Sequence, residues 1–139
     1  MHSLQDYICS HCPTGYDHSR DGKCVISFDQ QITVINDAIT ELMGRIPDKR
    51  YNQKWEQKMS QRIGQLEEAT NEDKSRCDPT STSAFIIAGV TESSECELAA
   101  VINAALLETA EEWICGKKES KKFTKQFPKL LKQFNKKNC

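Results

Sequence analysis

The sequence lacks the features that would place it in a membrane or in a common enzyme class. No apolar run approaches the roughly 18 residues that a membrane-spanning helix needs. The chain has three histidines, all N-terminal, and none forms a motif with a serine or cysteine nucleophile. Aromatic residues make up 7% and hydrophobic residues 37% of the chain, which is low for core formation but too high for a disordered chain. These absences predict a small non-enzymatic protein without a metal or cofactor.

The cysteine content indicates an oxidising compartment. The chain carries seven cysteines in 139 residues, and cytosolic proteins of this size rarely carry so many. Residues 2–6 are mostly polar and form no signal peptide, so we expect Met1 to be an expression start placed before the mature protein. We therefore expect a secreted, extracellular protein held together by disulfide bonds. Because seven is odd, one thiol is expected to stay unpaired or to join two chains.

A nearly continuous apolar stretch at 94–115 predicts the central helix of the fold. Its middle contains one polar residue, Asn103. A helix that is apolar almost all round belongs inside a protein, with partners on several sides. Ser94 and Glu97 have the spacing of a capping box, which predicts the start of this helix. Gly116 follows its end and is the expected C-cap.

Three more segments have the apolar spacing of helices. The first, 27–46, begins with a capping box of Ser27 and Gln30 and ends before Pro47. The second is 49–70. The third is 119–137, where Pro128 is expected to kink or restart the helix. The polar connection before the central helix contains the apolar segment 84–90, which we expect to be a short helix or an extended plug on the core.

Together these patterns predict an all-α fold. The expected architecture is a small, disulfide-stapled bundle of about four helices over residues 27–139. A short cysteine-rich hairpin is expected before it, over residues 1–26. At this length the chain is expected to form one main domain with a small appendage.

Residues 9–24 read CSHCPTGYDHSRDGKC and are rich in turn-forming residues. From Cys12 onward this stretch resembles the last hairpin of an epidermal-growth-factor-like module, with the pattern C-P-x-G-Y-x4-D-G-x-C. The matching residues are Cys12, Pro13, Gly15, Tyr16, Asp21, Gly22 and Cys24. The resemblance covers about a tenth of the chain. It implies a Cys12–Cys24 disulfide and an extracellular setting.

The other cysteines constrain how the helices can be arranged. Cys96 and Cys115 cannot pair in one continuous helix, because a rise of about 1.5 Å per residue separates them by about 28 Å, whereas a disulfide needs Cα atoms within about 7 Å. If the last helix folds back antiparallel, Cys139 arrives near Cys96, and Cys77 can reach the same end. We therefore expect a cluster of these three and a Cys9–Cys115 bond at the other end. The odd thiol is then Cys77 or Cys139, and a terminal cysteine is well placed to form a homodimer.

The same N-terminal cysteines allow a second interpretation. Cys9, Cys12, His18 and Cys24 follow the spacing C-x2-C-x5-H-x5-C, and three thiolates with an imidazole suit tetrahedral zinc. A zinc-dependent nucleic-acid-binding module is therefore an alternative function, which the basic C-terminus would suit. The hairpin pattern accounts for these residues better, so we favour disulfides, with no metal and no nucleic-acid partner. A redox role for the C-x-x-C motif lacks the βαβ context that it needs.

Charge is distributed unevenly along the chain. Residues 1–115 have a net charge of −9 and residues 116–139 a net charge of +8. The candidate residues for binding an anionic surface are Lys117, Lys118, Lys121, Lys122, Lys125, Lys129 and Lys132. Such a segment can bind membranes, glycosaminoglycans or nucleic acids. The interpretation favoured by the sequence is that its apolar face belongs to the core and its lysines offset the acidic remainder.

No set of residues predicts catalysis. Glu108, Glu111 and Glu112 are expected on the exposed side of the central helix, as solvated carboxylates and not as an acid–base pair. The predicted function is therefore binding or signalling, through the surface of the molecule, with another protein as the partner. An alternative is a carrier of a small apolar ligand such as a lipid, since small helical disulfide proteins can enclose a cavity.

Overall fold

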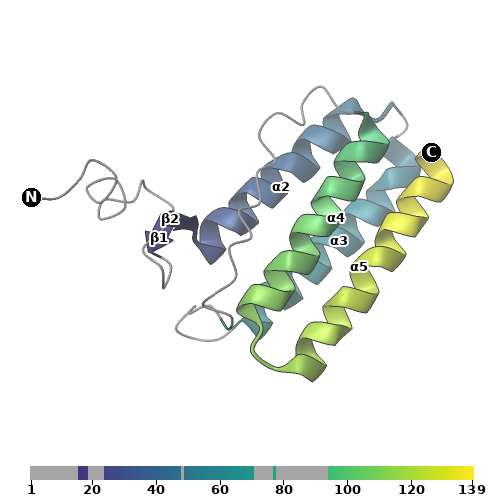
Figure 1. Ribbon diagram of the computed structural model, residues 1–139. Coiled ribbons are helices and arrows are strands. Elements are labelled where there is room, and N and C mark those ends of the chain that lie inside the picture. Colours follow the sequence, from purple (N-terminus) through teal and green to yellow (C-terminus); the bar gives the residue numbers. More distant parts are fainter. Residues whose placement is uncertain (1–15, 19–23, 48, 71–76, 78–93) are drawn as a thin grey trace, which may run out of the picture.

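The computed structural model describes residues 16–18, 24–47, 49–70, 77 and 94–139, and it shows four helices packed side by side beside a short hairpin (Figure 1). The expected all-α bundle with an N-terminal hairpin is confirmed. In the part of the chain that the structure describes, no helix is long and apolar enough to cross a membrane. The apolar segment 84–90 lies outside the described residues.

The N-terminal hairpin is antiparallel and lies within the turn-rich cysteine segment. Its strands are β1, Tyr16–His18, and β2, Cys24–Ile26. The paired residues are Tyr16 with Ile26, Asp17 with Val25, and His18 with Cys24. The Cys12–Cys24 disulfide that the resemblance implies lies outside the described side chains.

Helices α2 and α3 form the first helical hairpin. Helix α2 is Phe28–Arg45, and the hydroxyl of Ser27 accepts a hydrogen bond from the Gln30 N–H at 3.2 Å. This bond is one half of the expected capping box. Helix α3 is Lys49–Ala69. The break falls before Pro47, because a proline disfavours the helical conformation of the residue that precedes it, and Ile46 is extended with a ψ of 121°.

Helices α4 and α5 form the second helical hairpin. Helix α4 is Glu95–Trp113, and the Ser94 hydroxyl accepts a hydrogen bond from a first-turn N–H at 3.2 Å, as expected. Helix α5 is Lys117–Asn138. The expected C-cap role of Gly116 is wrong. The C-cap of α4 is Ile114, and Gly116, with a φ of −86°, is the N-cap of α5.

Pro128 does not restart α5, and the helix continues through it. The proline ring is exposed, on the side of the helix that faces away from the core. A carbonyl that loses its N–H partner on this side can bind water, which lowers the cost of a proline inside the helix. The expected restart of the helix at Pro128 is therefore wrong.

Each of the four helices runs antiparallel to both of its neighbours in the bundle. Around the bundle their order is α2, α3, α5 and α4 (Figure 1). Phe28 at the start of α2 meets Trp113 at the end of α4, with ring centroids 5.8 Å apart. The hydroxyl of Thr70, just after α3, donates a hydrogen bond to the Trp113 carbonyl. The C-termini of α3 and α4 therefore lie at the same end of the bundle. Helices α3 and α4 are therefore parallel, and Thr70 and Ser94 lie at opposite ends of the bundle.

The apolar stripes of all four helices meet in one core. The bulky side chains that are fully or almost fully buried include Ile35, Leu42, Leu66, Leu98, Ile102, Leu106, Phe127 and Phe134. Helix α4 is not enclosed all round as expected. It packs against α2 and α5, while Ala100, Ala104 and Glu111 on its outer side are exposed.

A buried polar group joins α2 to the end of α4. The Trp113 indole N–H donates to the Gln31 side-chain oxygen at 2.7 Å, and the Gln31 amide donates to the Glu112 carboxylate at 3.4 Å. Gln31 is 3% exposed and Glu112 4% exposed. The expectation that Glu112 faces solvent is therefore wrong, because tertiary hydrogen bonds compensate for its loss of water.

Two disulfides hold opposite ends of the bundle. Cys96 pairs with Cys139, as the expected antiparallel return of α5 allows. Cys77 pairs with Cys115, so the expected Cys9–Cys115 bond is wrong. Cys77 stays at this end because α3 stops there, and its N–H donates to the Glu112 carbonyl at 2.7 Å.

These pairs also correct the expected odd thiol. Cys77 and Cys139 are both paired, so the odd thiol is neither of them, and a homodimer through the unpaired cysteine stays a prediction. The three remaining cysteines all precede α2, and one of them must lack a partner within the chain because their number is odd. Their side chains lie outside the described part of the structure.

We predict that Leu106→Ala lowers the free energy of unfolding by about 2–5 kcal/mol, through lost transfer energy and an unfilled cavity. Leu106 is fully buried. Denaturant melts of the purified protein measure the change. Leu107→Ala is the control. The Leu107 side chain is only partly buried, so its truncation should lower the free energy of unfolding by less. A loss below about 1 kcal/mol for Leu106→Ala would contradict this account of the core.

Candidate functional site

The order of the helices around the bundle places like charges together. Helix α3 has a net charge of +2 and its neighbour α5 a net charge of +8. Helices α2 and α4, also neighbours, have net charges of −2 and −5. The bundle therefore has a basic side, formed by α3 and α5, and an acidic side, formed by α2 and α4.

Eight of the nine lysines of α5 form one exposed strip on the basic side. We call this strip the lysine face. It consists of Lys117, Lys118, Lys121, Lys122, Lys125, Lys129, Lys132 and Lys136, all of them exposed. At about 100° per residue, the eight positions span an arc of about 140°, and from the first to the last they extend about 28 Å along the axis. The arc lies opposite the buried stripe of Phe123, Phe127, Leu130 and Phe134.

The lysine face is not neutralised by ion pairs within the described structure. No carboxylate of the described residues forms an ion pair with any of its eight lysines. Five pairs of lysines within the face are spaced four residues apart, and like charges at this spacing destabilise a helix by about 0.2–0.5 kcal/mol per pair. Lys117 and Lys118 also lie in the first turn, where the helix dipole disfavours cations. The face thus costs folding stability.

Packing against α3 compensates for that cost on one flank of α5. The Trp55 indole N–H donates to the Leu130 carbonyl at 3.0 Å, and its ring lies 4.9 Å from that of Phe134. Near the same end of the bundle, Asn52 and Asn138 exchange two side-chain hydrogen bonds of 3.2 and 2.8 Å. These contacts fix the rotation of α5 about its axis, so that the lysines face solvent.

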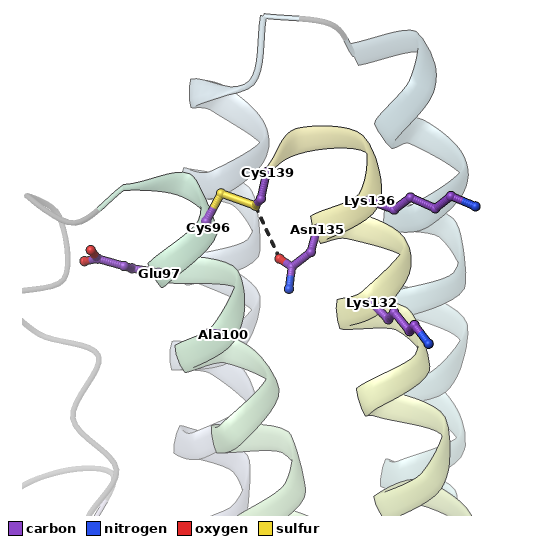
Figure 2. A pocket seen from close by; sticks show the side chains of 7 residues that line it. All are labelled: Cys96, Glu97, Ala100, Lys132, Asn135, Lys136 and Cys139. Atoms are coloured by element: carbon purple, nitrogen blue, oxygen red, sulfur yellow. Dashed lines mark hydrogen bonds between the residues drawn. A yellow bond between two sulfur atoms is a disulfide. The ribbon is translucent and has the colours of Figure 1, made fainter.

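The Cys96–Cys139 disulfide holds the end of α5 on its other flank, against α4. A shallow groove of about 620 Å³ lies beside it (Figure 2). Ala100 and the disulfide contribute apolar surface to this groove. In Figure 2, Lys132 and Lys136 extend away from α4, and Glu97 extends away from α5. The end of the lysine face thus borders an open groove and not an enclosed cavity.

Two basic residues of α3, Lys54 and Lys58, lie on the basic side but outside the lysine face. Lys54 and Lys58 are four residues apart and lie on either side of Trp55 in the sequence. Trp55 contacts α5, and Lys58, three positions further along the helix, lies on the same side of α3. Lys54 is exposed and Lys58 is half-buried. The sequence alone does not single out these two lysines, because only the packing of α3 against α5 brings them to the basic side.

The sequence-based candidates on α5 are all found together on the exposed strip. Lys136 was missed, although it follows Lys132 by four residues, a spacing that other lysines of the face also have. The expected burial of the apolar face of α5 is confirmed. The expected offset of acidic charge is not achieved by ion pairs among the described residues, since the carboxylates of α2 and α4 lie on the other side of the bundle.

The acidic side contains one carboxyl group with a shifted pKa. Burial raises the pKa of Glu108 above its ordinary value of 4.5, and the nearby charges of Glu112 and Glu111 raise it further. These three residues are not equivalent, since Glu111 is exposed, Glu108 is partly buried and Glu112 is buried. A single carboxyl group beside a buried, hydrogen-bonded one does not make an acid–base pair with a substrate cleft.

Among the described residues, no group of three or more His, Cys, Asp or Glu side chains is placed to hold a metal ion. The alternative zinc set of Cys9, Cys12, His18 and Cys24 lies outside the described side chains. No family model, curated protein or solved structure matches this chain. The functional assignment therefore depends on the geometry of the bundle itself.

We predict that Glu108→Gln stabilises the protein at neutral pH. Because the pKa of Glu108 is raised in the folded state, ionisation of this carboxyl group favours unfolding. The resulting loss of stability grows as the pH rises from about 4.5 through the folded pKa. The gain should disappear below pH 4.5, where the carboxyl is protonated in both states. Urea melts at neutral and acidic pH measure it. Asp37→Asn, exposed on α2, is the control, and an equal gain for both variants would contradict the stated cause.

We predict that Cys96→Ser with Cys139→Ser lowers the free energy of unfolding by about 2–4 kcal/mol, because a cross-link over 43 residues restricts the unfolded chain. Amide hydrogen exchange in the last turns of α5 should also rise. The control is Cys77→Ser with Cys115→Ser, at the opposite end of the bundle. It should destabilise the protein without selectively raising exchange in the last turns of α5. If the last turns of α5 stay fully protected in the first variant, the disulfide is not what holds the end of the lysine face.

Proposed function

We propose that this chain is a secreted, non-enzymatic binding protein that recognises an anionic partner through the lysine face of α5. The observation that carries the proposal is the lysine face of α5, eight exposed lysines without an ion-pair partner among the described residues. Two disulfides support an oxidising, extracellular setting, because such bonds are rare in cytosolic proteins.

The cost of the lysine face supports a role in binding. The apolar stripe of α5 would pack equally well with neutral polar residues on the opposite side of the helix. Repulsion between neighbouring lysines opposes helix formation instead. An anionic partner would relieve this repulsion on binding, and positive charge gathered on one side would also steer such a partner during encounter.

The two alternative functions have less support. A carrier of an apolar ligand needs an enclosed apolar site, whereas the described groove beside Cys139 is open and shallow. The described core is filled by side chains from all four helices. A zinc-dependent nucleic-acid-binding module depends on N-terminal side chains outside the described structure.

We predict that replacing Lys121, Lys125, Lys129 and Lys132 with Gln weakens binding to polyanions by about 100- to 1000-fold, at about 1 kcal/mol per lysine near an anionic surface. The free energy of unfolding should not fall and should rise by about 1–2 kcal/mol, since four of the five lysine pairs spaced four residues apart are removed. Fluorescence titration with dextran sulfate and polyglutamate at physiological ionic strength measures binding, and denaturant melts measure stability.

Asp37→Asn with Glu111→Gln, two exposed residues of the acidic side, is the control for general charge effects and should not weaken binding. Raising the salt concentration should weaken binding by the wild type more than by the quadruple variant. The proposal fails if the wild type binds neither polyanion at physiological ionic strength, or if the quadruple variant binds as well as the wild type.

A further inference from the structure

We infer that the partner of the lysine face is a linear sulfated polysaccharide lying along the axis of α5. This inference rests on the proposed function and specifies its ligand class. It comes from three properties of the lysine face: its length, its composition, and the burial of the apolar stripe behind it.

The length of the face favours an extended polymer. Its lysines recur at intervals of no more than four residues from Lys117 to Lys136, so every turn of the helix presents at least one ammonium group over about 28 Å. A ligand that reaches all of them must carry repeated negative charges along a line. A linear polyanion does this without a folded surface of matching shape.

The composition of the face disfavours a protein partner or single-stranded nucleic acid. Within the lysine arc the other residues are Pro128 and Asn135, with no aromatic residue and no arginine. The buried centres of protein interfaces are enriched in aromatic residues and arginine and depleted in lysine. Single-stranded nucleic acids bind by stacking on aromatic side chains, which this strip does not offer. Flexible lysine ammoniums suit dense negative charge without fixed geometry.

Burial of the apolar stripe disfavours insertion into a membrane. A helix that binds in a membrane interface puts its apolar side chains into the lipid. In α5 those side chains, Phe123, Phe127, Leu130 and Phe134, are in the core of the bundle. Within the lysine face the only uncharged residues are Pro128 and Asn135, so it exposes no large apolar side chain. In the oxidising setting that the disulfides indicate, sulfated polysaccharides are the linear polyanions that extracellular proteins meet.

The test uses two matched pairs of substitutions at opposite ends of the face. Lys118→Gln with Lys122→Gln lies in the first half of α5, and Lys132→Gln with Lys136→Gln lies in the second half. Each pair has a spacing of four residues. Lys54→Gln with Lys58→Gln, on α3, removes the same charge at the same spacing and is the control.

Isothermal titration of the full chain with heparin oligosaccharides of increasing length provides the readout. Affinity should rise with length until the sugar spans about 28 Å and should then stay constant. For oligosaccharides of that length, each α5 pair should weaken binding by about 30-fold. The α3 pair should weaken it by less than about threefold. Circular dichroism checks that all three variants keep the helical content of the wild type.

Other outcomes identify other partners. Loss confined to Lys132→Gln with Lys136→Gln, with no dependence on sugar length, would overturn the inference in favour of a compact acidic protein docking beside the groove. Equal or tighter binding to phosphatidylserine vesicles or duplex DNA, at matched ionic strength, would overturn it in favour of a membrane or nucleic acid. In each case the proposed anionic partner survives. Absence of binding to every polyanion would reject both proposals.

Discussion

Burial of the apolar stripe of α5 is the interaction on which the rest of this structure depends. This helix has a net charge of +8, and repulsion among its lysines opposes its formation in isolation. Its stability therefore comes from Phe127, Phe134 and their neighbours in the core, from Trp55 of α3, and from the Cys96–Cys139 disulfide. Since α5 contacts both α3 and α4, its docking also closes the bundle.

The same packing creates the division of charge. Burying one side of α5 leaves its opposite side, with eight lysines, in solvent. Because α5 lies next to α3 and α4 lies next to α2, the basic helices form one side and the acidic helices the other. The electrostatic feature that we propose as the binding surface is thus a consequence of the order of the helices around the core.

Local signals predicted the helices well. The Ser27 and Ser94 caps and the spacing of apolar residues gave helix limits within a few residues of those observed, because both signals act over short stretches of chain. The same spacing placed most of the lysine face. Lys136 was available from the sequence too, whereas Lys54 and Lys58 required the contact between α3 and α5.

Long-range features were harder to predict. The partner of Cys77 depends on α3 and α4 being parallel, and the polar connection between them has no periodic pattern that reveals its path. The burial of Glu112 depends on Gln31, which is 81 residues away in the sequence. The helix through Pro128 depends on which side of α5 faces solvent. Each of these outcomes is set by tertiary packing, which the local sequence does not record.

Lysine footprinting tests the central claim most directly. The full chain would be acetylated briefly with and without a saturating sulfated polysaccharide, and the modified lysines quantified by mass spectrometry. The account predicts protection of the lysine face along its whole length, from Lys117 to Lys136, with much weaker protection of Lys54 on α3. Protection that is uniform over the chain, or that is absent from α5 while the ligand is bound, would contradict it.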